Sequence, residues 1–284
     1  FISLNLSAIY LKLQLVGKAK ESTSSAGDED IKVSDVYKSG LTIVNNIAHS
    51  IFSNINVRLG NQLITRSGDG YPFKTYIQLL CNSSKESQDT FFRVTGWKKD
   101  TAGAMDDSIG TDKTTTTNKA ALARREEFFN ADDGIGEFYI RPHTGLTFLE
   151  MPIIPYLDIE FELERHPTRD FYLMHKSKNS SFGIKILEAR YHVQRFRGKP
   201  SLLKDLEVMT RANPVSIDMN EGHINNFTIT SGVRNYSNEN MFHNHVPNRI
   251  IFAFVRTDAY NGASTKNPFN FQHFAIEYVR LTKN

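Results

Sequence analysis

The sequence has few of the features that mark secreted or membrane proteins. It contains a single cysteine, Cys81, which excludes an intramolecular disulfide, so the fold must depend on its apolar core. A chain without disulfides fits a reducing compartment. No apolar run reaches the ~18 residues that a membrane-spanning helix needs, and no signal peptide is visible at the N-terminus. We therefore expect no membrane span.

Motifs for nucleophilic or nucleotide chemistry are also missing. The sequence has no G-x-S-x-G and no Walker A loop, and Gly134-Ile135-Gly136 lacks the third glycine of a dinucleotide-binding turn. Cys81 falls late in an amphipathic segment, where a small buried hydrophobe is the usual role. These absences leave nucleophilic catalysis poorly supported, and we predict a protein that is not an enzyme and that carries neither a cofactor nor a metal.

Charge gives little indication of the partner. The net charge is only +3, and the adjacent pairs Lys98-Lys99 and Arg124-Arg125 are interpreted as solvated faces. The basic stretch 189–199 could meet nucleic acid, but a charged strand edge is the preferred interpretation, because such edges prevent stray strand pairing. We predict no specific nucleic-acid binding.

The residues that are abundant favour β structure. The chain holds 20 Phe and 11 Tyr against one Trp, and aromatic residues suit half-buried pleated surfaces. Apolar and polar residues alternate in several segments, which predicts antiparallel strands with one wet face. The alternating segments are YLKLQLV, INVRL, LDIEFEL and HFAIEYVRL, and RIIFAFV (Arg249–Val255) is apolar on both faces, as in a central strand.

Local signals place a hairpin and a few short helices. Gly60-Asn61 joins two strand patterns, and both residues tolerate the positive φ that a two-residue turn needs. YPFKTYIQLLCN is predicted to be a helix with Phe73, Ile77 and Leu80 on one face. NKAALARREEFF and SLLKDLEVMTRA are also predicted helices, the latter with Ser201 as N-cap, and IVNNIAHSIF is ambiguous between helix and strand.

Two ligand-binding alternatives remain open at this point. His243 and His245 could bind a metal from one face of a strand, with His223 or His273 as distant partners, although no glutamate lies nearby. Histidines in a loop are the preferred interpretation. A jelly-roll module that recognises carbohydrate or another surface ligand is the second alternative.

The stretch from Thr257 to Leu281 joins a turn-rich loop to a strand pattern. Asn261-Gly262 predicts a tight turn with positive φ, and Pro268 keeps the preceding residue extended. The aromatic residues are expected to pack and the amides to brace the backbone. We interpret this stretch as a structural corner that could touch a neighbouring subunit, and its key residues are Asp258, Tyr260, Asn261, Gly262, Asn267, Pro268, Phe269, Asn270 and Phe271.

Five segments, in order, resemble one protein family. They are NNIAHSIFSNINVRLGNQLIT, YPFKTYIQLL, KDTAGAMDD, ALARREEF and PNRIIFAFVRTDAYNGASTKNPFNFQHF. Their order and spacing are similar to the double jelly-roll major capsid protein, or hexon, of Polinton/Maverick elements and adintoviruses. The most specific blocks are DAYNG at 258–262 and KNPFNF at 266–271. A minor capsid protein, which has one jelly roll, is the structural alternative.

The resemblance implies an all-β chain of two antiparallel sandwiches with a few short helices in loops. Residues 1–196 would form the first jelly roll, with its first strand missing. Residues 197–213 would be a linker with a short helix, and 214–284 would begin the second, incomplete jelly roll. The family forms homotrimeric, pseudo-hexagonal capsomers that contact other capsomers and penton or minor capsid proteins. The implied location is the virion, assembled inside the host cell around double-stranded DNA.

Overall fold

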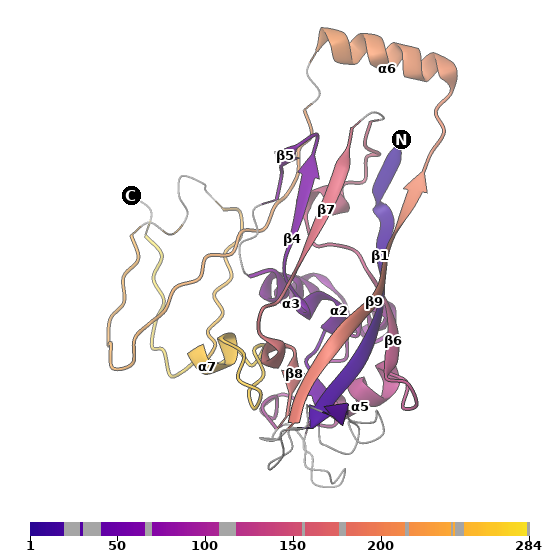
Figure 1. The fold of residues 1–284 in the computed structure, drawn as a ribbon. Coiled ribbons are helices and arrows are strands. Elements are labelled where there is room, and N and C mark those ends of the chain that lie inside the picture. Colours follow the sequence, from indigo (N-terminus) through magenta and orange to yellow (C-terminus); the bar gives the residue numbers. More distant parts are fainter. Residues whose placement is uncertain are drawn as a thin grey trace.

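The chain has a β-rich fold in which antiparallel sheets are joined by short helices (Figure 1). The computed structural model describes residues 1–19, 29–30, 41–65, 70–107, 118–154, 157–175, 180–213, 216–239, 241 and 247–282. The strands are β1 (Ile2–Ala19), β2 (Glu29–Asp30), β3 (Thr42–Ile43), β4 (Phe52–Leu59), β5 (Gln62–Leu63), β6 (Ile135–Ile140), β7 (Ile159–Arg165), β8 (Leu173–Met174) and β9 (Ser180–Arg195). The α-helices are α2 (Ile47–Ser50), α3 (Tyr71–Asn82), α4 (Lys85–Asp89), α5 (Lys119–Phe128), α6 (Pro200–Ala212) and α7 (Thr257–Tyr260), and the 3-10 turns are η2 (Phe91–Thr95), η3 (Gly145–Phe148) and η4 (Arg169–Phe171).

Strand β1 is the centre of the largest sheet. It pairs antiparallel with β9 along almost its whole length, and with β6 and β2 on its other side. The predicted alternation is confirmed here, because Leu11, Leu13 and Leu15 are fully buried while Lys12 lies on the outer face and meets Glu137 of β6. Period-two patterning therefore set both the strand and the face that it buries.

A second sheet, in the order β5-β4-β7, faces this one. The turn between β4 and β5 consists of Gly60 and Asn61, with φ of 52° and 66°, and it pairs Leu59 with Gln62. Two consecutive residues with positive φ match the twist of antiparallel strands. A short pair, β3 with β8, closes the lower end of the core.

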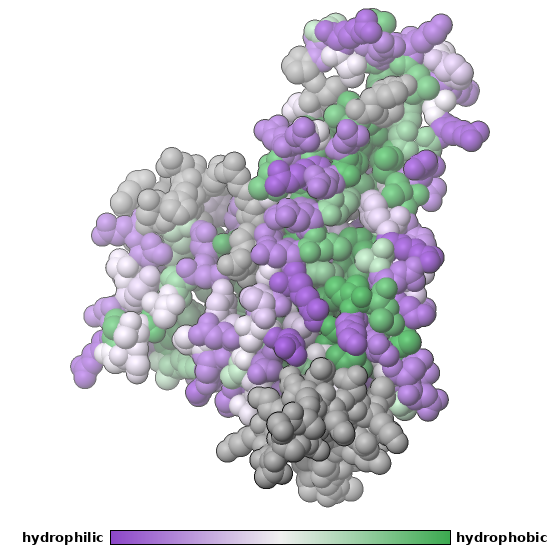
Figure 2. All heavy atoms as spheres, viewed as in Figure 1, coloured by the Kyte–Doolittle hydropathy of each residue, from purple (hydrophilic) through white to green (hydrophobic). Residues whose placement is uncertain are grey.

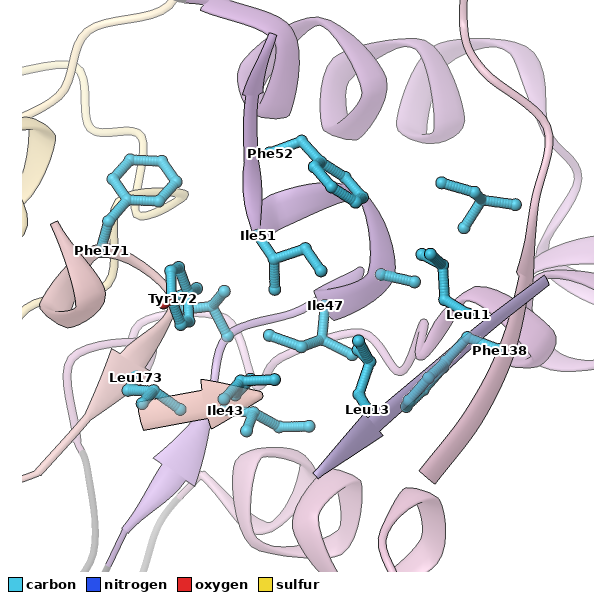
Figure 3. Packing of buried hydrophobic residues seen from close by; sticks show 14 of the residues in the cluster. Leu11, Leu13, Ile43, Ile47, Ile51, Phe52, Phe138, Phe171, Tyr172 and Leu173 are labelled. Carbon is cyan, nitrogen blue, oxygen red and sulfur yellow. The ribbon is translucent and has the colours of Figure 1, made fainter. Parts of the chain in front are cut away.

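The core fills the space between the sheets and the helices. Figure 3 shows side chains from β1, β3, β4, β6, α2 and the η4–β8 segment pointing at one another. The ambiguous IVNNIAHSIF segment contains the end of β3, the single helical turn α2 and the start of β4. Ile47 of α2 and its C-cap residue Ile51 belong to this cluster.

Helix α3 matches the predicted bounds, but its buried face was wrongly predicted. Phe73 is buried as expected, whereas Tyr76 and Leu79 are buried in place of Ile77 and Leu80, which are only partly covered. Cys81 is exposed rather than buried. The apolar pattern continues around the helix, so composition alone did not identify the side that meets the sheets.

The interpretation of Arg124-Arg125 as a solvated pair was also wrong. The Arg124 side chain is 0% exposed and pairs with Asp100 at 2.7 Å, while it donates to the carbonyls of Ile43 and Lys98 at 3.1 and 2.7 Å. Arg125 is buried too and donates to the Leu41 carbonyl. The two arginines join α5 to β3 and to the 98–100 loop, because buried cations need hydrogen-bonded partners.

The strands expected near the C-terminus are not found in the described residues. Arg249–Val255 and 273–281 are extended or bent but not paired as strands, and one backbone hydrogen bond, from Gln272 N–H to the Phe254 carbonyl, links them. Phe274 and Ala275 have positive φ, which interrupts the second pattern. A strand pattern gives a strand only where a neighbouring strand supplies hydrogen bonds.

Several surfaces remain open. Helix α6 begins with Pro200 in its first turn, and its N-cap is Lys199 rather than the predicted Ser201. None of its residues is buried, and Figure 1 shows it projecting from the sandwich.

Among the described strands β9 pairs on one side only, which agrees with the strand edge expected at 189–199. Ile186 and Leu187 of β9 are exposed, and green apolar surface is visible on the β7–β9 side in Figure 2.

Within the ranges described above, no helix combines the length and apolarity required to cross a membrane.

The Arg124–Asp100 pair gives a test of the core. We expect Arg124→Met to lower the free energy of unfolding by about 3–5 kcal/mol, because the Asp100 carboxylate would stay buried without its partner. Urea unfolding followed by Trp97 fluorescence measures the change. Arg93→Met is the matched control, since Arg93 forms an exposed ion pair with Glu127 and should cost less than about 1 kcal/mol. Equal losses in both variants would contradict the assignment of Arg124 and Asp100 as a buried ion pair on which the core depends.

Candidate functional site: the α3 junction

Helix α3 carries two sets of contacts on opposite sides. We call α3 and the segments that pack on it, 141–145, 219–224 and 257–271, the α3 junction. Six consecutive residues at the start of the helix, 71–76, are buried. Because a helix presents a new direction every 100°, burial of six in a row means that it is surrounded on all sides there.

The corner at 257–271 packs on α3 through two ring stacks. Tyr260 stacks on Phe73 with centroids 5.3 Å apart and planes 6° apart, and Phe269 stacks on Tyr76 at 4.3 Å and 2°. Phe269 is 1% exposed. Pairs of this kind contribute about 0.5–1.5 kcal/mol beyond the burial of their area, so the corner is held firmly on the helix.

Asn267 fixes the backbone of the corner. It is fully buried, its N–H donates to Asp106 Oδ1 at 2.8 Å, and its side-chain oxygen accepts the Phe269 N–H at 3.0 Å. Lys266 Nζ lies 3.4 Å from the same Asp106 carboxylate. The side chain of Asn267 thus braces the loop as expected, whereas Asn270 bonds through its backbone N–H, which donates to the Asn267 carbonyl.

The DAYNG turn is shaped by one glycine. Gly262 has φ of +87°, and a Cβ there would lie 2.7 Å from Thr168 Cγ2 and 3.0 Å from the Phe171 nitrogen. Asn261 has φ of −79°, so the prediction of positive φ holds only for Gly262. Hydrogen bonds from Arg256 hold the pKa of the Asp258 carboxyl below its ordinary value, and Asp258 also accepts the Ala259 N–H at the start of α7.

The opposite side of α3 contains a pair of histidines, of which His49 is buried and His143 is half-buried. His49 Nδ1 lies 2.8 Å from the Tyr71 hydroxyl, and the rings of His49 and His143 meet edge to face at 5.1 Å. His143 Nδ1 lies 2.8 Å from Gln78 Oε1. Burial lowers the pKa of His49 to about 3 and, with nearby positive charge, lowers the pKa of His143 as well, so both rings are neutral at pH 7.

Above the histidines a buried ion pair holds the 219–224 segment. Lys74 contacts Glu221, with side chains 4% and 14% exposed, and the other Glu221 oxygen accepts the Gly145 N–H at 2.6 Å. Ile224 covers Gly70, where a Cβ would come within 2.7 Å of its side chain. No sequence motif marked His49, His143 or Glu221, because their contacts join residues 22 to 147 positions apart.

The other predicted candidates do not converge on this junction. His243 and His245 lie outside the described residues, and His223 and His273 are exposed. Over the described ranges no three His, Cys, Asp or Glu side chains are grouped in a way that could hold a metal ion.

An apolar hollow of about 360 Å³ lies beside the last turns of α3 and is lined partly by Cys81, Phe252 and Phe271.

Comparison with known proteins gives little guidance. No protein-family model matches the chain, and no solved structure matches it. An uncharacterized protein of Caenorhabditis elegans, F54H12.2, is 22% identical over 241 residues. The match covers 84% of this chain but 53% of the relative, so the chain spans about half the length of the relative.

The stack of Phe269 on Tyr76 predicts that the 257–271 corner contributes to the stability of the chain. We expect Phe269→Ala to destabilise the chain by about 3–5 kcal/mol, because it removes a fully buried ring and leaves a cavity beside Tyr76. Trp97, whose ring lies 5.2 Å from Tyr76, reports the change through its fluorescence during urea unfolding. Tyr278→Ala is the control, since Tyr278 is 71% exposed and should change stability by less than about 0.5 kcal/mol. A Phe269→Ala variant as stable as that control would exclude a structural role for the corner.

Proposed function

We propose that the chain is part of the major capsid protein of a double-stranded DNA virus or virus-like element, of the double jelly-roll type. The observation that carries the proposal is the place of the resembling segments in the fold. They are scattered over more than 200 residues of sequence, yet they pack on one another around α3. This arrangement supports a resemblance in structure as well as in sequence.

The contacts between these segments are specific. Asp100 of KDTAGAMDD pairs with Arg124 of ALARREEF, and Asp106 of the same segment holds Asn267 of KNPFNF. Tyr260 of DAYNG stacks on Phe73 of YPFKTYIQLL. These contacts join the segments that carry the resemblance, which supports the proposal that they belong to one packed fold.

In this proposal residues 1–196 form the first jelly roll and 214–284 begin the second. The two facing antiparallel sheets support the first part. For the second part, the support is the uncovered apolar character of the C-terminal residues: Ile251, Val279 and Leu281 are 49%, 53% and 54% exposed. Large apolar patches left exposed mark surfaces that other chain segments or subunits cover.

The proposed protein is structural rather than catalytic and acts as a homotrimer. Three copies, each with two jelly rolls, would form a pseudo-hexagonal capsomer that contacts neighbouring capsomers and penton or minor capsid proteins. The Phe-rich composition supports this role, since subunit interfaces of this kind need aromatic and apolar contacts.

The test is to express the longer protein that carries this chain and to measure its mass by light scattering and its shape by electron microscopy. We expect trimers and, on assembly, particles built of pseudo-hexagonal units. Protein that stays monomeric both free and under conditions of particle assembly would overturn the proposal.

A charge placed in the residues that are proposed to begin the second jelly roll should block assembly. We expect Ile251→Asp to reduce the trimeric fraction about tenfold or more, because burying an unpaired carboxylate costs more than about 1.4 kcal/mol. Thr230→Asp, at another exposed position outside the apolar segments, is the control and should assemble normally. Equal assembly of both variants would show that the 249–255 segment stays uncovered.

A further inference from the structure

The histidine pair and the segment that returns from α6 meet the same side chain of α3, since Gln78 bonds His143 and lies 3.3 Å from where a Cβ of Gly222 would be. Residues 219–224 are held on the body of the protein by Glu221, which bridges Lys74 of α3 and the N–H of Gly145 at the start of η3. His143 precedes Gly145 by two residues and is hydrogen-bonded to Gln78, one helical turn beyond Lys74. The anchor and the histidines therefore share the same two supporting elements.

The hydrogen bonds define where a proton would go. Tyr71 Oη accepts the backbone N–H of His143 at 3.4 Å, which leaves the hydroxyl proton of Tyr71 free to be donated to His49 Nδ1 at 2.8 Å. His143 Nδ1 faces the oxygen of Gln78 and is therefore its protonated nitrogen. The remaining His143 nitrogen has no hydrogen on it in this tautomer, so it is the atom that gains a proton in acid.

The charged groups around the two histidines disfavour the protonation of either ring. The groups around the pair are Tyr71, Lys74 and Gln78 from α3, and Arg141 and Phe148 on either side of His143. Glu221 of the returning segment is linked to them through Lys74. Lys74 and Arg141 are cations, and the Glu221 carboxylate is already paired with Lys74. A third positive charge in this buried space would compete for Glu221 and repel Lys74.

We propose that His49 and His143 form an acid-sensitive latch, which holds the 219–224 segment on α3 and η3 while both rings are neutral and releases it when they gain protons. The released segment lies between α6 and the 257–271 corner, so acid would free this connection while the corner stays anchored on α3 by Tyr260 and Phe269. The latch is a property of this chain and does not depend on the capsid proposal.

The direction of the pH effect follows from proton linkage. Both rings bind protons more weakly in the latched state than when exposed to water, so opening is accompanied by proton uptake. The latch is at full strength above about pH 6.5, the ordinary pKa of histidine. It weakens progressively as the pH falls below that value.

Hydrogen exchange tests the latch directly. Exchange of the Gly145 and 219–224 amides is measured by mass spectrometry at pH 7.5 and pH 5.0 and corrected for the intrinsic rates. We expect protection to fall by about tenfold or more at pH 5.0, since each histidine can contribute up to about thirtyfold at 1.5 pH units below its ordinary pKa. Amides of β1 should keep their protection, which distinguishes local release from global unfolding.

The double variant His49→Gln with His143→Gln should remove the pH dependence, because glutamine stays neutral. His223→Gln is the matched control, since His223 lies in the returning segment but is exposed, and it should behave like the wild type. Unchanged protection between the two pH values in the wild type, or an equal loss in the double variant, would overturn the proposal. If the double variant does not fold, the wild type alone provides the test, because exchange of the imidazole C2 hydrogens reports whether each ring is neutral or protonated. Loss of amide protection at pH 5.0 while both rings remain neutral would refute the latch.

Discussion

The first two turns of α3 must be covered on every side, and the rest of the structure follows from this constraint. Tyr71 points to one side of the helix, Phe73 and Tyr76 point to the opposite side, and all three are buried. The sheets alone can cover only one side of a helix, so other segments must cover the rest. The 257–271 corner covers Phe73 and Tyr76, and the 141–145 and 219–224 segments cover Tyr71 and Lys74. Residues near both ends of the chain thus belong to one packed unit.

Apolar packing and buried polar contacts have different roles in this unit. The stacks of Tyr260 and Phe269 supply contact area, but flat rings tolerate some sliding. The hydrogen bonds of Asn267 with Asp106, and of Arg124 with Asp100 and two carbonyls, have narrow geometric requirements. They fix which residue of each loop meets which residue of its neighbour. A buried polar network of this kind contributes more to a unique arrangement than to net stability.

The elements that sequence could predict are those whose signals are local. The alternation in β1, the turn at Gly60-Asn61 and the extents of α3 and α5 depend on residues within a few positions of each other. Burial of Arg124 depends on an acid 24 residues away and on two carbonyls, and the histidine pair depends on His49 meeting His143. Long-range partners of this kind leave no periodic signal in a single sequence. The same reason explains why Arg249–Val255 failed as a strand prediction, since the pattern was suitable but no partner strand was adjacent.

The exposed C-terminal side chains and the buried start of α3 are consequences of one arrangement. The corner at 257–271 is anchored on the sandwich, while the residues on both sides of it, 247–256 and 272–282, extend away with apolar groups uncovered. An anchor flanked by two uncovered extended segments positions them side by side, and the Gln272–Phe254 hydrogen bond joins them at their base. Segments held in this way need little further ordering before another strand can pair with them. The contacts of Phe269 with Tyr76 and of Asn267 with Asp106 already offset the conformational entropy that is lost when these two segments are brought together. The α3 junction therefore holds together segments from distant parts of the sequence and fixes where the two uncovered segments begin.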